Sequence, residues 1–180
     1  MMFSTRSAMV VAALGLVLGM GTAAEARGRG SSGSSGAGGG PFALGLILGE
    51  PTGLSGKLFV SRRNALDFAV GFGSGYYDDH GTRVHVDYLW HPQALTKNAT
   101  FVMPFYIGIG GIISDHHHYN DRIGIGPRVP FGIDMYFRTA PVDVFFELAF
   151  AMDLIDDEDR NGDRHRRAWI EGAIGVRYSF

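Results

Sequence analysis

The sequence predicts an all-β fold, an eight-stranded antiparallel up-and-down β-barrel that spans a membrane. Residues 41–180 hold eight segments in which apolar residues alternate with small or polar ones, the period of two that is typical of strands. The chain ends on such a segment, and its last residue is the aromatic Phe180. No apolar run, including the N-terminal one, reaches the length of about 20 residues that a spanning helix needs. Strands that face lipid must then close into a barrel, because an open sheet edge cannot be exposed to hydrocarbon.

The N-terminal residues are expected to lie outside this barrel. Residues 1–26 have the anatomy of a secretory signal peptide, with an early positive charge, an apolar stretch over about residues 9–20, and an Ala-x-Ala cleavage pattern that ends at Ala26. Residues 27–40 contain only Arg, Gly, Ser and Ala, a composition that predicts a flexible linker. Residues 41–180 are then the outer-membrane barrel domain.

The first four strands are expected at residues 42–49, 54–61, 65–72 and 82–90. A tight turn over residues 50–53, with Pro and Gly at suitable positions, separates the first two. Polar segments at residues 62–64 and 73–81 separate the next pairs. The outward apolar positions are Leu44, Leu46 and Leu48, then Leu54, Leu58 and Val60, then Leu66, Phe68, Val70 and Phe72, and finally Val84, Val86 and Tyr88.

The other four strands are expected at residues 100–113, 123–137, 142–152 and 168–180. The connections before them cover residues 91–99, 114–122, 138–141 and 153–167, and the last of these is the most polar. With a periplasmic N-terminus, the three long polar loops all fall on the outer side, as in known membrane barrels. Aromatic residues at the inner ends of the strands would form one interfacial belt: Phe42, Trp90, Phe101, Phe137, Tyr178 and Phe180.

The inward face of the strands carries charges of both signs. The interior of an eight-stranded barrel is just filled by side chains, so these groups are expected to pair across the lumen and to leave no channel. Prolines at 104, 127 and 130 predict bulges, or a sixth strand that begins only near residue 131, because proline donates no ladder hydrogen bond. The inward charged positions are Lys57, Asp67, Arg83, His85, Asp87, Arg128, Asp134, Arg138, Asp143, Glu147, Glu171 and Arg177.

A soluble barrel of the lipocalin type is the alternative fold. It has the same alternation, but its apolar side chains point inward and its charges point outward. The aromatic belt and the terminal Phe180 favour the membrane barrel.

Residues 41–180 resemble the small eight-stranded outer-membrane barrels, of the OmpX kind and of the OmpA transmembrane domain. More narrowly, residues 49–57 (Gly-Glu-Pro-Thr-Gly-Leu-Ser-Gly-Lys) and residues 130–147 are similar to an uncharacterised family of such barrels. The terminal strand resembles the signal through which the outer-membrane barrel assembly machinery recognises its substrates. The resemblance implies a location in the outer membrane of a Gram-negative-type bacterium, and it implies no catalytic residue.

Two loop segments contain candidate metal ligands. Residues 157–163 match the first half of a calcium loop, with carboxylate or amide oxygens at Asp157, Asp159, Asn161 and Asp163, but position 168 is Ala where a bidentate Glu is needed. His116, His117 and His118 lie between two aspartates in another outer loop, with further histidines at 80 and 165, and could bind Zn²⁺. The favoured interpretation is a solvated, charged loop near lipopolysaccharide for the histidine segment and an acidic hairpin tip for residues 157–163, so no resident cofactor is expected.

Enzymatic chemistry is not expected. His85 and Asp87 share one face of a strand, but no motif places a serine beside them, so lumen pairing is favoured over a Ser–His–Asp hydrolase. The absence of cysteine excludes thiolate catalysis, and a net charge of −2 suggests no nucleic-acid partner. We therefore predict a monomeric barrel whose loops serve envelope integrity, adhesion or surface-ligand interaction. A transporter of small apolar molecules, of the OmpW type, is the first alternative, and a lipid-modifying enzyme is the second.

Overall fold

The structure, a computed structural model, describes residues 40–73, 81–116, 122–152, 154 and 168–180. The expected signal peptide and nearly all of the expected linker lie outside these ranges. The described residues include no helix that is long and apolar enough to cross a membrane. They form β1 (Phe42–Gly49), β2 (Thr52–Phe59), β3 (Asn64–Phe72), β4 (Thr82–Trp90), β5 (Ala94–Lys97), β6 (Phe101–His116), β7 (Arg122–Phe137), β8 (Val142–Met152) and β9 (Ala168–Ser179).

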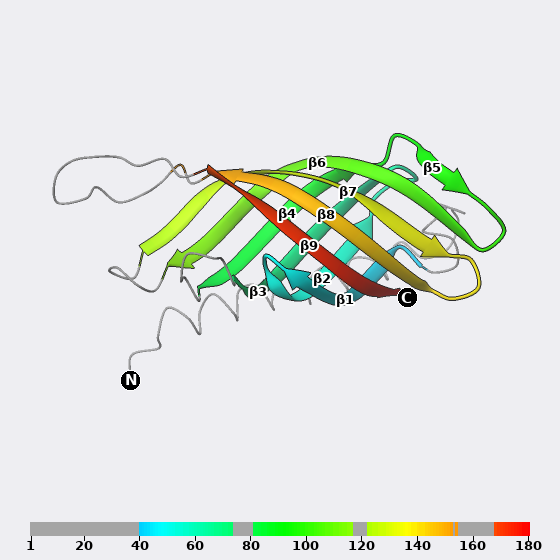
Figure 1. The fold of residues 1–180 in the computed structure, drawn as a ribbon, viewed down its shortest axis with the longest axis horizontal. Coiled ribbons are helices and arrows are strands. Elements are labelled where there is room, and N and C mark those ends of the chain that lie inside the picture. Colours follow the sequence, from blue (N-terminus) through cyan, green and yellow to red (C-terminus); the bar gives the residue numbers. More distant parts are fainter. Residues whose placement is uncertain (1–39, 74–80, 117–121, 153, 155–167) are drawn as a thin grey trace. The chain divides into compact units, whose positions relative to one another are not determined.

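Eight of these strands close into an antiparallel up-and-down barrel, as the sequence predicts (Figure 1). Each strand pairs with its sequence neighbour, except that β4 pairs with β6 across the short β5. The barrel closes where β1 pairs with β9, with Ala43 opposite Ser179 and Gly49 opposite Ala173. Closure leaves no free edge in the eight-stranded sheet.

The connections divide between the two ends of the barrel. Residues 50–51, 73–81, 117–121 and 153–167 join strands at one end, here called the loop end. Residues 60–63, 91–100 and 138–141 join them at the other, here called the turn end, where β9 also finishes. The three long segments therefore share one end, as expected. The strand β5 was not expected, and it pairs with the first residues of β6 at the turn end.

The structure corrects several strand boundaries. The second strand begins at Thr52 and not at residue 54, because Gly53 already pairs with Gly71 of β3. The turn is therefore only residues 50–51, and Gly49 enters it with a φ of +127°, a conformation that glycine adopts at little steric cost. At the loop end both long strands exceed their predicted length, because β6 continues to His116 and β7 already begins at Arg122.

The three prolines cause no bulge between β6 and β7 and no late start of β7, but the register between β5 and β6 does shift beside Pro104, which lies opposite Ala94. The register between these strands is constant from Phe101 opposite Phe137 to His116 opposite Arg122. Pairing lapses only around Pro104 and around Pro130, while Pro127 still lies opposite Gly111. Each lapse occurs where a proline lacks the N–H that the ladder needs, and the long neighbouring strands carry the register across it.

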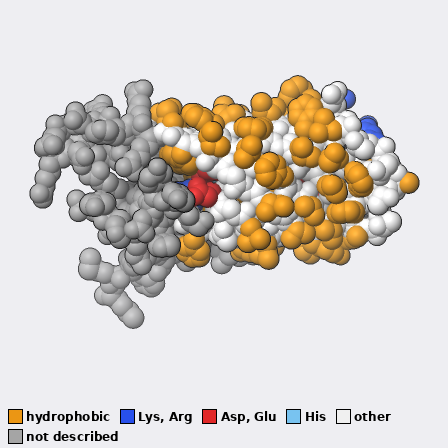
Figure 2. All heavy atoms as spheres, viewed as in Figure 1, with side chains coloured by type: hydrophobic (Ala, Val, Ile, Leu, Met, Phe, Trp, Pro, Cys, Tyr) orange, Lys and Arg blue, Asp and Glu red, His pale blue; other side chains and the backbone are white. Residues whose placement is uncertain are grey.

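The outer surface of the barrel is apolar. Ile109 and Ile170 are 67% and 72% exposed, and on the face shown in Figure 2 apolar side chains cover most of the described wall. The predicted inward charges lie in the lumen and are at most 9% exposed. Apolar side chains thus point out and charges point in, which is the reverse of the lipocalin-type alternative. Arg138 is an exception, because it follows the last residue of β7, is exposed, and donates to the carbonyl oxygen of Asn98.

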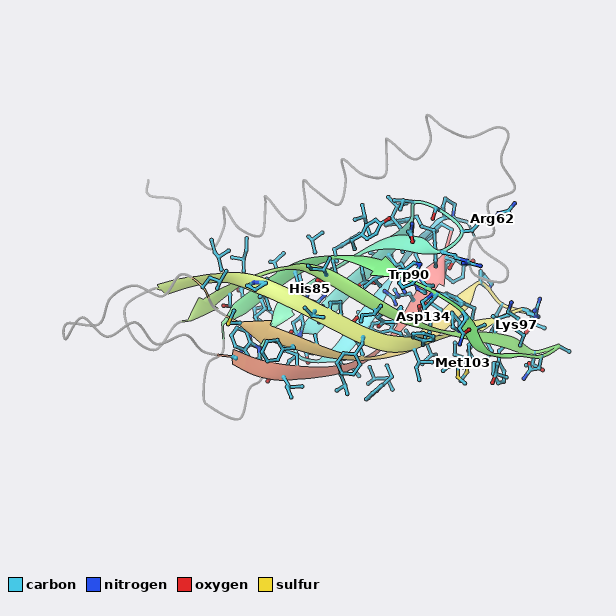
Figure 3. All side chains as sticks on the ribbon, turned by 90° about the horizontal axis from the view of Figure 1, so that it is seen from above. Arg62, His85, Trp90, Lys97, Met103 and Asp134 are labelled. Carbon is cyan, nitrogen blue, oxygen red and sulfur yellow. The ribbon has the colours of Figure 1, made fainter. Side chains whose placement is uncertain are left out.

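Aromatic and basic side chains gather at the turn end. The predicted belt residues all lie at strand ends there, and the rings of Phe42 and Phe180 are 6.3 Å apart between centroids. The exposed charged side chains among the described residues are basic and lie in the turn-end connections, from which Arg62 and Lys97 project in Figure 3. The complete set is Arg62, Arg63, Lys97 and Arg138.

Candidate functional site

The lumen contains two clusters of buried ion pairs, each built around one arginine. The turn-end cluster surrounds Arg177 of β9, and the loop-end cluster surrounds Arg128 of β7. In Figure 3, Asp134 of the first cluster lies nearer the turn end than His85, which lies beside the second. Each of these side chains points inward because its position alternates with the outward apolar residues of the same strand.

In the turn-end cluster, Arg177 binds three carboxylates from three strands. Its guanidinium pairs with Asp67 of β3, with Asp134 of β7 at 3.2 Å and with Asp143 of β8 at 3.0 Å. The cation also lies 3.9 Å from the centroid of the Phe145 ring. One side chain therefore joins walls that lie on opposite sides of the lumen.

Asp134 is the most heavily bonded carboxylate in this cluster. It accepts from the Lys57 ammonium at 2.7 Å and from the Tyr136 hydroxyl at 2.8 Å, and one of its oxygens lies 3.1 Å from Nε2 of His91. The other nitrogen of His91, Nδ1, lies 3.1 Å from the carbonyl oxygen of Arg63. Both nitrogens thus lie within hydrogen-bond distance of an oxygen atom. Arg177 and Lys57 are the fixed cations that face the three carboxylates of this cluster.

In the loop-end cluster, Arg128 also binds three carboxylates. It pairs with Asp87 of β4, with Glu147 of β8 at 2.6 Å and with Glu171 of β9 at 3.0 Å. Arg83 extends the cluster toward the rim, where it lies 3.0 Å from Glu50 and 3.3 Å from Glu171. Two guanidinium groups therefore face four carboxylates, a formal excess of two negative charges.

Neutral donors complete this cluster. The hydroxyl of Tyr106 donates to Glu147 at 2.8 Å, and the indole N–H of Trp169 donates to Glu171 at 2.9 Å. Such bonds satisfy carboxylate oxygens that would otherwise be buried without a partner, a state that costs several kcal/mol for a charged group. The predicted list of lumen residues omitted these neutral donors and His91. Tyr106 and Tyr136 occupy positions in their strands that alternate with the outward apolar residues. This alternation alone could have placed both side chains in the lumen.

The clusters fill the barrel interior at their levels. Lys57, Asp134, Arg128 and Arg177 are each no more than 1% exposed. A water-filled passage beside them would leave their side chains accessible, so no such passage runs past the described residues of the two clusters. The prediction that lumen charges pair and do not line a channel is confirmed for these residues.

His85 lies against the loop-end cluster without joining its hydrogen bonds. Its Nε2 is 3.8 Å from Oδ2 of Asp87, beyond hydrogen-bond range, and neither ring nitrogen has a partner among the described residues. The inward Ser114 of the neighbouring strand β6 is also buried, and its hydroxyl bonds neither His85 nor any other described group. The described residues therefore assemble no Ser–His–Asp arrangement at His85.

The predicted metal-binding residues fall almost entirely outside the described ranges. This applies to His117, His118, Asp157, Asp159, Asn161 and Asp163, so a metal site there stays a prediction. His116 is the last residue of β6 and not a loop residue. A different set of possible ligands lies in the lumen, where one atom each from His85, Asp87 and Glu147 come within 4.8 Å of one another.

Comparison with known proteins supports the fold. A crystal structure of the N-terminal β-barrel domain of Pseudomonas aeruginosa OprF matches with a TM-score of 0.51 at 14% identity, over 77% of this chain and 94% of that one. No protein-family model matches the chain, and no curated protein matches it. The chain thus shares the small β-barrel fold of that OprF domain. The narrower resemblance of residues 49–57 and 130–147 to one uncharacterised family stays a prediction.

Proposed function

We propose that this chain is a non-enzymatic barrel of the outer membrane of a Gram-negative-type bacterium. The distribution of polarity is the observation that carries the proposal. Side chains such as Ile109 and Ile170 are largely exposed around the outer wall, while arginines and carboxylates are buried inside. Water would penalise this arrangement, since soluble monomers expose only small contiguous apolar patches. Hydrocarbon outside a closed barrel favours it.

The turn end fits the periplasmic side of such a membrane. Aromatic rings at the strand ends suit the interface between headgroups and acyl chains. The basic side chains just beyond them, such as Arg62 and Lys97, suit contact with anionic headgroups. The long loops would then face outward, where their carboxylates meet lipopolysaccharide. Delivery to the barrel assembly machinery through the C-terminal strand is part of the same proposal.

The barrel itself serves as a rigid frame for the loops. Ion pairs join opposite walls at two levels, so the strand ends that carry residues 73–81, 117–121 and 153–167 are held in fixed positions. We propose that these loops act in envelope integrity, adhesion or binding of surface ligands. A closed sheet offers no edge for strand pairing with a second copy, which favours a monomer.

Membrane fractionation tests the location. The chain should appear in the outer-membrane fraction and run as a compact band on a gel without boiling, shifting to its full mass when boiled. A mature chain that folds to the same band in plain buffer, without detergent or lipid, would contradict the proposal.

Fluorescence quenching tests which side of the wall meets lipid. The chain has two tryptophans. Trp90 is 50% exposed on the outer wall, and the indole of Trp169 is bonded to Glu171 in the lumen. In vesicles of lipid brominated near the headgroup, the variant Trp169→Phe, which keeps Trp90, should be strongly quenched. The variant Trp90→Phe should be quenched much less, and equal quenching of both would contradict the assigned faces.

Conductance measurements distinguish a barrel that only supports its loops from a transporter of small apolar molecules. With the lumen filled by the two clusters, purified protein in planar bilayers should show no steady channel. Stable unitary currents, or uptake of small apolar molecules into vesicles, would favour transport. A lipid-modifying activity that His85→Ala abolishes would favour the enzyme.

A further inference from the structure

His85 is a buried polar group that the ion-pair clusters do not use. Its ring is 1% exposed, and both nitrogens lack partners among the described residues. A neutral imidazole needs one acceptor and one donor, and each unmet need destabilises a buried site. Oδ1 of Asp87, two residues along the same strand, is also buried without a partner.

The surroundings of His85 carry uncompensated negative charge. The loop-end cluster has four carboxylates and two guanidinium groups. Three of these carboxylates are buried, whereas Glu50 at the rim is 22% exposed. Excess charge in a closed lumen is costly unless something neutralises it. The imbalance and the unpartnered imidazole occur at the same place.

The geometry at this place suits a metal ion. One ligand atom each from His85, Asp87 and Glu147 lie within 4.8 Å of one another. In a tetrahedral site, ligands about 2.0–2.2 Å from Zn²⁺ lie about 3.4 Å from one another, so shifts of these side chains by about 1 Å would close the site. One imidazole and two carboxylates are ligands that Zn²⁺ accepts, with a fourth position left for water.

The neighbouring hydrogen bonds would orient these ligands. Tyr106 holds one oxygen of Glu147 and Arg128 holds the other, so that carboxylate is fixed in the lumen. Arg128 also fixes Asp87 through Oδ2, which leaves Oδ1 free. The positive charge of Arg128 opposes a cation, but the three buried carboxylates that contact Arg128 outweigh it.

We propose that His85, Asp87 and Glu147 form a divalent transition-metal site, with Zn²⁺ as the ion that fits best. The ion joins β4 to β8, which are separated by two strands on one side of the barrel, and it neutralises the loop-end cluster. Because the site is buried, the ion enters while the barrel forms and leaves slowly afterwards.

Metal analysis after refolding tests the site. The mature chain is refolded into detergent micelles with Zn²⁺, treated with EDTA, passed through a desalting column and assayed for bound zinc. A background variant with His116, His117 and His118 changed to Ser removes the histidines that were predicted from the sequence as candidate zinc ligands. This background should keep about one zinc per chain. Loss of all zinc to EDTA as fast as from the unfolded chain would overturn the proposal.

Variants in the same background assign the ligands. His85→Asn should lose the zinc, whereas His91→Asn, a histidine change in the other cluster, should keep it. Tyr106→Phe should keep the barrel and weaken zinc binding about 10- to 100-fold, as removal of a group that orients a ligand does. Heat-shift gels show which variants fold. If His85→Asn does not fold, Glu147→Gln replaces it, and retention of one zinc by either folded variant overturns the assignment.

Discussion

Replacing Arg177 with Met should destabilise the barrel strongly. The substitution keeps most of the aliphatic length of the side chain but removes the cation at the centre of the turn-end cluster. Asp67 and Asp143 then lose the only cation with which they pair among the described residues, whereas Asp134 keeps Lys57 and His91. Breaking a buried pair by removing one partner costs about 3–5 kcal/mol. Because two carboxylates lose their partner at once, we expect about 4 kcal/mol or more, about a thousandfold in the folding equilibrium.

Urea unfolding in phospholipid vesicles measures this loss. Folded fractions are read from heat-shift gels, and tryptophan fluorescence follows the same transition. Arg138→Met is the matched control, because Arg138 is exposed and its Nε bonds only a backbone carbonyl in a turn-end connection. The control should change the free energy of unfolding by no more than about 0.5 kcal/mol.

A triple variant separates charge from packing. When Asp67→Asn and Asp143→Asn accompany Arg177→Met, no carboxylate is left without its cation, so most of the lost stability should return. The reasoning is refuted if Arg177→Met costs no more than the Arg138 control. It is also refuted if the triple variant is no more stable than the single one, because the cost would then come from lost packing.

Two further pairs of substitutions test the lumen and the outer wall. Gly110→Ala places a methyl group inside van der Waals contact with Asp87 and the adjacent backbone, and should cost about 1–3 kcal/mol in urea unfolding. The neighbouring Gly111→Ala points outward with its nearest contact at 3.6 Å and should be tolerated, so similar losses from the two would contradict the assigned faces. Ile174→Lys, at the middle of the outer wall, should cost about 2–4 kcal/mol in lipid vesicles. Tyr178→Lys, near the turn end, should cost about 0–1 kcal/mol, and no difference between the two in the same urea titration would argue against a lipid-facing wall.

Most of the face assignment was available from the alternation alone. Side chains of a strand alternate between its two faces, so Lys57, Arg128 and Arg177 could be placed on the charged face without any knowledge of strand pairing. The aromatic belt and Phe180 were needed to assign that face to the lumen. The rule fails for Arg138 because the strand ends at Phe137 and the chain turns, so parity no longer has meaning there. The alternation also places Tyr106 on the inward face of its strand, but it does not predict the hydrogen bond from Tyr106 to Glu147, which is 41 residues away.

Strand lengths and the extra strand depend on partners. The strands β6 and β7 extend together at the loop end because each supplies the other's hydrogen bonds. The added residues, 114–116 and 122, do not show a clear strand pattern by themselves. The short β5 forms only because the first residues of β6 offer it a ladder. The prolines were expected to mark bulges or to delay the start of the sixth strand. The register shifts only between β5 and β6, beside Pro104, because pairing on either side of each proline keeps β6 and β7 aligned.

Alternation along the chain was sufficient to determine the eight strands of the barrel, their order and which face of each carries charge, because a period of two is a local property of the backbone. The contacts within the lumen were decided by the tertiary structure alone. Lys57 and Asp134 are 77 residues apart, and they meet because the stagger of all the strands brings them to one level of the barrel. The same stagger brings His85 and Asp87 beside Glu147, since the closed barrel wall brings β4 and β8 to face one lumen.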